Sequence, residues 1–212
     1  MPRLPILLAC LLAGLSATGA AAERRTPILL PCEDCEGALD GLPKDLPAIT
    51  RIAPAGEPGT ALRLTGIVRD RHGQPRAGVI VYAHQTDALG VYPPLPTAAG
   101  EAAMRHGRLR GWARTDAAGR YTFDTIRPGR YPQSDMPAHI HLYIVAPGCA
   151  LYYIDDVQFE DDPALTPAKR RASDIGRGGG GIVMPVLRNG VWQVSRDIAL
   201  GRNVRGYPRC AP

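Results

Sequence analysis

The sequence predicts an all-β protein built as an antiparallel β-sandwich, and three observations support this fold class. Apolar and polar residues alternate along several short segments, as they do in strands with one buried face. Turns rich in Asp, Asn and Gly separate these segments. Glycine (24 residues) and proline (21 residues) form about a fifth of the 212 residues, which is typical of folds with many turns and short strands. We expect about seven to nine strands.

The strand-like segments follow one another with clear turns between them. Residues 70–75 (DRHGQP) and 116–119 (DAAG) are Asp-Gly turns, and Asn189-Gly190 is a hairpin signal. Residues 162–172 (DPALTPAKRRA) are the one expected helix. Residues 177–181 (RGGGG) form a flexible turn, because the Lys-Ser/Thr sequel of a phosphate loop is missing. The segments with a strand pattern are 61–70, 77–85, 111–115, 120–126, 138–146, 152–160, 181–190 and 191–200.

The N-terminus has the pattern of an export signal. Arg3 precedes an apolar stretch from Leu4 to Leu15, and the small residues that follow contain an A-x-A pattern at residues 20–22. The stretch is shorter than a membrane span, so we expect an exported protein, periplasmic or secreted, without stable membrane association after cleavage. The expected division of the chain is a signal peptide (1–22), an irregular N-terminal arm (23–58) and one β-sandwich domain (59–212).

The charge pattern argues against one class of partner. The net charge is +5 and the isoelectric point is about 9.1, but the basic residues are dispersed. Nucleic-acid binding is not expected, because no basic stripe interleaved with aromatic residues is found. The oligomeric state is open, and a homodimer is one assembly that we consider.

Export affects the interpretation of the cysteines. Cleavage leaves Cys32, Cys35, Cys149 and Cys210, and an oxidising compartment favours disulfides, with three pairings open. The alternative for C-E-D-C is a zinc or redox site. A zinc ribbon needs a second close pair, and a redox site needs a thioredoxin-like βαβ pattern. Neither is found, so we expect structural disulfides.

Two histidines at the start of a strand form the most informative local pattern. Residues i and i+2 of a strand point to the same face, so His139 and His141 present two imidazoles side by side. Neutral imidazole binds iron, copper, nickel and zinc. The alternative is a solvated strand face with no metal.

Two tyrosines in loops complete a candidate metal site. Tyr92 (LGVYPP) and Tyr131 (GRYP) each follow a glycine-containing turn and precede a proline. A phenol becomes an anionic ligand when a strong Lewis acid lowers its pKa, and ferric iron can do this. Of the other histidines, we expect His72 and His106 to be exposed, whereas His84 is a candidate neighbour of the site.

The chain contains, in order, LTGIVRDRHGQPRAGVIVYAHQTDALGVY, GWARTDAAGRYTFDTIRPGRYP and PAHIH. This ordered set, within residues 62 to 163, resembles the intradiol ring-cleavage dioxygenases, a family that includes catechol 1,2-dioxygenases and protocatechuate 3,4-dioxygenases. The small exported members, with a C-x-x-C segment and YYIDD, look most similar. The resemblance implies long active-site loops on the sandwich.

The resemblance implies an Fe(3+) cofactor, with Tyr92, Tyr131, His139 and His141 as metal ligands. Tyr131 would be the axial ligand that leaves when a catechol binds, and its catalytic role would be to accept a substrate proton. His139 would lie opposite Tyr131. The reaction implied is cleavage of a catecholic small-molecule substrate by O2, between its two hydroxylated carbons, to a muconate-type diacid.

Two positions depart from the pattern of the family. Met136 stands where the family has an arginine, three residues before the first histidine. Asp156 stands where an active-site glutamine is expected. Arg130 or Arg127 is a candidate replacement for the missing positive charge. The metal site thus matches the family, while the surroundings of the substrate differ.

Two other functions compete with the dioxygenase. The hairpin segments also resemble carboxypeptidase-regulatory-like and transthyretin-like domains, which would make the chain a non-catalytic binding module. An iron-binding relic of the enzyme is a third possibility. The combined tyrosine and histidine set favours the enzyme, because a binding module does not need all four residues.

Overall fold

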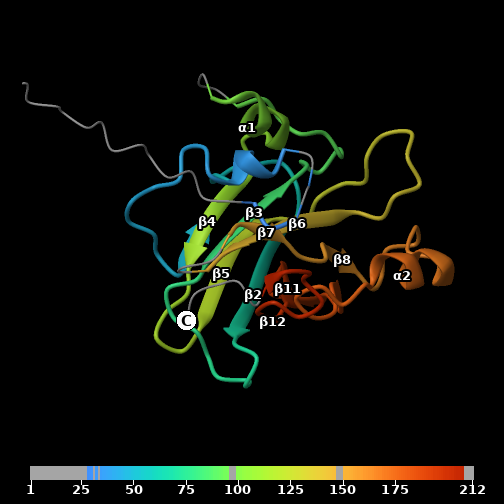
Figure 1. The fold of residues 1–212 in the computed structure, drawn as a ribbon. Helices are drawn as coiled ribbons and strands as arrows, with labels where there is room; N and C mark the ends of the chain where they lie inside the picture. The colour runs from blue at the N-terminus through green and yellow to red at the C-terminus, as the bar shows by residue number, and fades with distance from the viewer. Residues whose placement is uncertain (1–27, 31, 33, 96–98, 147–149, 208–212) are drawn as a thin grey trace, which may run out of the picture.

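The computed structural model describes residues 28–30, 32, 34–95, 99–146 and 150–207, and these residues form two packed sheets (Figure 1). The predicted signal peptide, Cys149 and Cys210 lie outside the described residues. The first sheet has the strand order β1 (Ile49–Arg51), β5 (Arg120–Ile126), β2 (Ala61–Arg69), β11 (Val191–Ser195) and β10 (Val186–Arg188), and β12 (Ile198–Ala199) also pairs with β2. The second has the order β4 (Arg110–Arg114), β3 (Ile80–Gln85), β6 (His139–Val145), β8 (Val157–Phe159) and β9 (Ile182–Val183), and β7 (Tyr152–Tyr153) also pairs with β6.

The hydrophobic core lies between the two sheets and follows from the alternation of the strands. In the first sheet, Leu64 of β2 pairs with Phe123 of β5, and both are 0% exposed. In the second sheet, Val81 of β3 and Leu142 of β6 belong to the same buried cluster. Burying such side chains contributes about 1.5–3 kcal/mol each. The predicted all-β sandwich is therefore confirmed.

The strands are more numerous than predicted, because three predicted segments are each divided and β1 forms within the predicted arm. Segment 152–160 gives β7 and β8, segment 181–190 gives β9 and β10, and segment 191–200 gives β11 and β12. Pro185 explains the second break, because proline has no backbone N–H to donate to a neighbouring strand. The central hairpins are antiparallel as predicted, but β1 with β5, β11 with β2, β12 with β2, and β8 with β9 are parallel pairs.

The segment predicted to be an irregular arm is partly regular. It contains a 3-10 helix, η1 (Cys35–Ala38), and strand β1, which extends the first sheet beside β5. A short helix, α1 (Glu101–His106), also was not predicted. The predicted helix is α2 (Pro167–Ser173), and it starts later than expected because the Thr166 side chain caps its first turn. Neither of these α-helices has the length and apolar character needed to cross a membrane.

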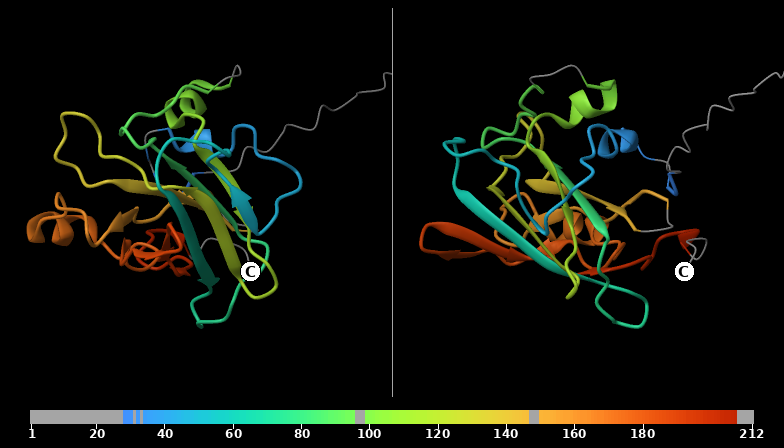
Figure 2. Two further views of the ribbon diagram at one scale, coloured as in Figure 1. Left: turned by 180° about the vertical axis from the view of Figure 1, so that it is seen from behind. Right: turned by 90° about the vertical axis from the view of Figure 1, so that its left-hand side faces the viewer.

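The N-terminal segment covers the outer face of the second sheet. Figure 2 shows η1 beside α1 at one end of the sandwich. The Trp112 indole donates to the Ala38 carbonyl at 2.7 Å, and the Arg110 guanidinium donates to the carbonyls of Gly37 and Asp40 at 2.9 and 2.7 Å. Strand β3 is consequently buried on both faces. A second, smaller buried cluster therefore lies between the outer face of the second sheet and the N-terminal segment.

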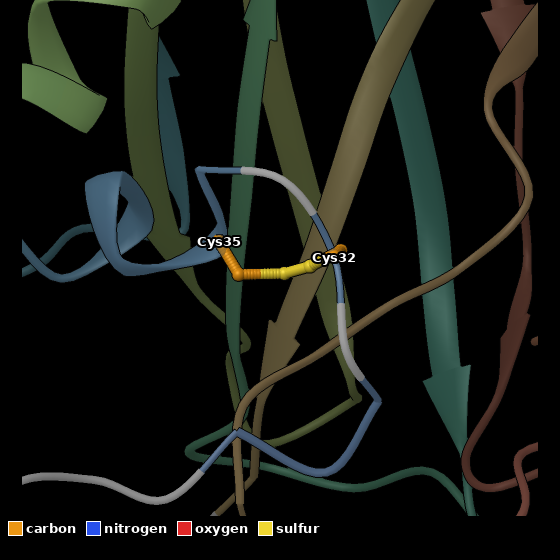
Figure 3. Close-up of a disulfide and its surroundings, with 2 residues drawn as sticks. All are labelled: Cys32 and Cys35. Carbon is orange, nitrogen blue, oxygen red and sulfur yellow. A yellow bond between two sulfur atoms is a disulfide. The ribbon is translucent and has the colours of Figure 1, made fainter.

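A disulfide lies in this covering segment and joins Cys32 to Cys35 (Figure 3). Cys35 is buried with Ala38 against Tyr82 and Tyr143 of the outer face. The two cysteines of the C-E-D-C motif are therefore paired with each other. It closes a short loop that packs directly on the sheet.

His106 is buried, contrary to the prediction that it is exposed. It is the last residue of α1 and is only 3% exposed. Its Nδ1 lies 2.8 Å from the Tyr82 hydroxyl, and its ring stacks on His84 with 3.8 Å between centroids. Burial, together with the nearby His141 imidazole, lowers the pKa of His106 to about 4.

The free energy of unfolding of the metal-free protein should fall by roughly 3 kcal/mol between pH 7 and pH 4 through His106. Unfolded His106 takes up its proton near pH 6.5, whereas the folded residue does so near pH 4, so acidification favours the unfolded chain. Burial also lowers the pKa of His84, which adds to the same slope. Urea unfolding at several pH values measures it. A His106→Gln variant should show a shallower slope between pH 6.5 and 5, and an unchanged slope would contradict the assignment.

Candidate metal centre

The four predicted ligands converge on one point although they come from three parts of the chain. His139 and His141 are the first and third residues of β6, Tyr92 lies in the loop after β3, and Tyr131 lies between β5 and β6. The two phenol oxygens are 2.7 Å apart, and the two Nε2 atoms are 3.1 Å apart. Tyr92 Oη is 3.0 Å from His141 Nε2, and Tyr131 Oη is 3.1 Å from His139 Nε2.

The outer hydrogen bonds of the imidazoles fix which nitrogen faces the centre. His139 Nδ1 donates to the Pro137 carbonyl at 2.8 Å, and His141 Nδ1 donates to the Asp156 carboxylate at 3.0 Å. Because these oxygens only accept, each neutral ring carries its hydrogen on Nδ1. Both Nε2 lone pairs therefore point toward each other, an arrangement that a cation between them would stabilise.

The electrostatics of the centre fit a strongly acidic metal ion. Burial lowers the pKa of His139, so its imidazole is neutral and able to bind a metal. Burial raises the pKa of both Tyr92 and Tyr131, so without a cation both are neutral phenols. Only a strong Lewis acid would convert them to phenolates at neutral pH. Two phenolates and two imidazoles suit a trivalent ion and leave a net charge of about +1.

Asp156 fixes the orientation of His141 through a hydrogen bond on the side of the ring that faces away from the centre. Its carboxylate is near enough to count with His139 and His141 as a three-residue cluster, but it bonds the Nδ1 edge of His141, which faces away from the centre. Burial alone would raise the pKa of Asp156, yet the His141 imidazole and its hydrogen bond hold that pKa below its usual range. A carboxylate in this position fixes the ring and increases the basicity of the ligand nitrogen.

His84, which the sequence analysis named as a candidate neighbour of the site, lies directly behind His141. The two residues are paired in register across β3 and β6, and their rings stack with 4.5 Å between centroids. His84 also stacks on His106, so three imidazoles form a column under the centre. In the described part of the chain, neither ring nitrogen of His84 has a hydrogen-bond partner.

The two tyrosine loops are held against each other by backbone contacts. The Asp87 carboxylate accepts from the N–H groups of Leu89 and Val91 at 2.9 and 3.0 Å, which fixes the loop before Tyr92. The Asp87 carbonyl accepts from Gly129 N–H at 2.7 Å, which ties in the loop before Tyr131. Gly90 has a positive φ of 82° and abuts the Arg130 carbonyl. Only glycine fits this close approach.

The structure also places the residues near the departures from the family pattern. Met136 is 47% exposed, and the two arginines proposed to replace the missing charge differ in their surroundings. Arg127 pairs with Asp161, and Arg130 is exposed. Sequence reasoning missed Gln158, which pairs with His139 in register. The Gln158 Oε1 atom is buried and unpartnered among the described residues. The signal that could have found it is the strand alternation of β8, which puts Gln158 on the same face of the sheet as His139.

The fold and these four converging side chains agree with the family that the sequence resembles. The family model described as "Dioxygenase" matches residues 43–173, which is more than half of the chain. The similar curated proteins and solved structures are named as catechol 1,2-dioxygenases or protocatechuate 3,4-dioxygenases. The chain belongs to the intradiol ring-cleavage dioxygenase family, as the three sequence segments predicted.

Two curated relatives are similar over part of their length. The chain is 31% identical to the protocatechuate 3,4-dioxygenase beta chain of Burkholderia cepacia over 135 residues, covering 61% of this chain and 57% of that protein. It is 29% identical to catechol 1,2-dioxygenase 2 of Acinetobacter lwoffii over 149 residues, covering 58% of this chain and 52% of that protein. The chain thus spans little more than half the length of these relatives.

Two solved structures have a similar fold. The dioxygenase domain of a dioxygenase carbohydrate-binding protein fusion from Streptomyces sp. SirexAA-E has a TM-score of 0.57 at 25% identity, covering 75% of this chain and 91% of that one. Catechol 1,2-dioxygenase from Acinetobacter sp. ADP1 has a TM-score of 0.57 at 21% identity, covering 79% and 62%. The second likeness concerns the fold alone.

Replacing Gly90 by alanine should separate the two tyrosine loops. A methyl group at Gly90 would overlap the Arg130 carbonyl, whereas one at Gly73 meets nothing within 4 Å at a similar φ of 78°. We expect Gly90→Ala to reduce Fe(III) affinity by about 10-fold or more, as loss of supporting contacts does. Competition against a chelator measures the affinity. Gly73→Ala carries only the strain of the positive φ, so equal affinities for both variants would contradict the role of the contact.

Replacing Asp156 by asparagine should weaken metal binding while leaving the fold intact. The amide removes the negative charge behind His141, and such losses reduce metal affinity by about 10- to 100-fold. Fe(III) titration followed by absorbance provides the measurement. Asp124→Asn, which removes a carboxylate paired with Arg63 on the first sheet, is the matched control. An Asp156→Asn affinity equal to that of the control would show that the carboxylate does not support the centre.

Proposed function

We propose that this protein binds Fe(III) through Tyr92, Tyr131, His139 and His141 and uses O2 to cleave the ring of a catechol to a muconate-type diacid. The observation that carries the proposal is the facing pair of Nε2 lone pairs with two phenol oxygens within hydrogen-bonding distance. Family membership gives independent support. Bound iron would supply Lewis acidity and draw electron density from the catecholate, which makes the ring reactive toward O2.

The protein groups around the centre have distinct roles in this proposal. His139 and His141 present lone pairs whose direction is set by the Pro137 carbonyl and by Asp156. Tyr131 Oη lies within reach of the other three donor groups, and it is the group we assign to accept a proton from a catechol hydroxyl. Proton transfer by a positioned side chain typically contributes a factor of about 10²–10⁴ to the rate.

We further propose that the protein is exported, with residues 1–22 as its signal peptide. The apolar stretch and the A-x-A pattern support this assignment, and a disulfide between Cys32 and Cys35 suits an oxidising compartment. We also propose the division into an arm at residues 23–58 and a domain at residues 59–212; β1 lies in the arm and pairs with β5 of the domain.

Protein reconstituted with Fe(III) should be burgundy, with a broad visible absorption band that shifts when catechol is added. The band would arise from charge transfer between phenolate and iron, so Tyr92→Phe should remove most of it. Tyr207→Phe, a change beside Tyr152 and outside the centre, is the matched control.

An oxygen electrode separates the remaining alternatives. Oxygen uptake on catechol together with the band supports the enzyme. A colourless protein after reconstitution would contradict the metal assignment and favour the binding module. A coloured protein that consumes no oxygen with any catechol would favour the iron-binding relic.

A further inference from the structure

The imidazole of His141 needs a second contact to hold its orientation. The hydrogen bond between His141 Nδ1 and the Asp156 carboxylate fixes one edge of the ring, but a single bond at an edge lets the plane of the ring tilt. The side chain is also 26% exposed, so packing does not enclose it on every side. Because the final torsion of a histidine side chain is broad, a contact on the face of the ring is required to set its plane.

The plane of His141 decides whether the two ligand nitrogens converge. The rings of His139 and His141 are almost perpendicular, with 82° between their planes and 4.6 Å between their centroids. Their Nε2 atoms are 3.1 Å apart in this arrangement. A tilt of His141 about its Nδ1 edge would move its Nε2 atom away from that of His139 and from the Tyr92 oxygen. A residue that prevents this tilt therefore supports metal binding without being a ligand.

His84 supplies the contact on the face of His141. The two residues pair directly across β3 and β6, so two identical side chains start at the same height and their rings overlap. The rings stack with 4.5 Å between centroids and 21° between planes. His84 is 4% exposed, and in the described part of the chain neither of its ring nitrogens has a hydrogen-bond partner. Its orientation therefore comes from the rings on its two faces.

The other face of His84 lies on His106, which is anchored by its own contacts. These two rings are nearly parallel, with 3.8 Å between centroids and 9° between planes. The Tyr82 hydroxyl lies 2.8 Å from His106 Nδ1. Gly37 of η1 lies so close to the ring that a methyl group on it would be 2.8 Å from His106 Cε1. His106 therefore cannot move away, and His84 is confined between two rings.

We propose that His84 is a positioning residue for His141: its flat ring, backed by His106, holds the His141 imidazole in the plane that directs Nε2 to the metal. The inference rests on the proposed function for the identity of the metal, but not for the orientation of His141 in the metal-free protein. Asp156 fixes the edge of the ligand ring and His84 fixes its face, so the two contacts restrain different motions. The property that matters is the flat surface, because the His84 nitrogens bond to no group among the described residues.

The test replaces the flat ring of His84 by side chains of another shape. His84→Leu and His84→Met fill the space without a flat face, and both avoid burying unpaired nitrogens, which favours folding. We expect each to weaken Fe(III) binding by about 10-fold or more, as loss of contacts that orient a ligand does. His84→Phe keeps a flat ring at the same height and should keep the wild-type affinity. Competition against a chelator measures all three variants.

Phe123→Leu is the matched control, because it also exchanges a buried ring for an aliphatic side chain. Phe123 is 0% exposed and packs beside Tyr121 in the other sheet. The control should lower stability and leave the Fe(III) affinity unchanged. A loss of affinity as large as that of His84→Leu would show that any weakening of the core has this effect, and the inference would be wrong.

Nuclear magnetic resonance of the metal-free proteins gives a readout that does not need iron. The ring nitrogens of His141 should give one set of signals, with the hydrogen on Nδ1, in wild-type protein and in His84→Phe. In His84→Leu and His84→Met we expect averaged or doubled signals, because the ring is free to tilt and its hydrogen bond to Asp156 is made only part of the time.

The possible outcomes separate this inference from the proposed function. Lower affinity in His84→Leu and His84→Met, with wild-type affinity in His84→Phe, supports the inference. Equal losses in all three variants, no loss in any of them, or unchanged His141 signals in His84→Leu overturn it. If wild-type protein binds no Fe(III), the proposed function fails, and the His141 signals alone decide whether His84 sets the plane of the ring.

Discussion

The register of β6 between β3 and β8 is the constraint on which the rest of the structure depends. Alternate residues of this strand face opposite sides, so Ile140 and Leu142 enter the core while His139 and His141 face outward. A shift of one residue would exchange the two sets. The register is held because the inward residues are buried against the other sheet. The core therefore sets the direction of both imidazoles before any metal is bound.

The outer face of the second sheet is covered by other parts of the chain, so the sandwich has a second buried region besides its core. Strand β3 has no exposed face, because the segment from Cys35 to Asp40 and helix α1 lie over it. The stacked imidazoles of His106, His84 and His141 occupy this covered region. Their burial makes the region dry, which raises the pKa of the tyrosines and lowers that of the histidines. The same burial that stabilises the covering segment thus sets the chemistry of the centre.

Sequence reasoning could predict what depends on local pattern. The strands, the hairpin turns and the same-face relation of His139 and His141 follow from alternation. The assignment of Tyr92 and Tyr131 came from the family resemblance, and the structure brings both to the histidines. The sequence could not predict the burial of His106, because that depends on α1 packing against η1 across about 70 residues of chain. It also could not predict that the buried Arg196 donates hydrogen bonds to the backbone carbonyls of residues 177–179, because such contacts leave no periodic signal.

The contact between Gly90 and the Arg130 carbonyl has a consequence for how such a centre can diverge. Two loops that touch through backbone atoms cannot be altered independently, whatever side chains they carry. The loop before Tyr92 and the loop before Tyr131 therefore form one exchangeable unit. A chimaera between relatives would have to transfer both loops together.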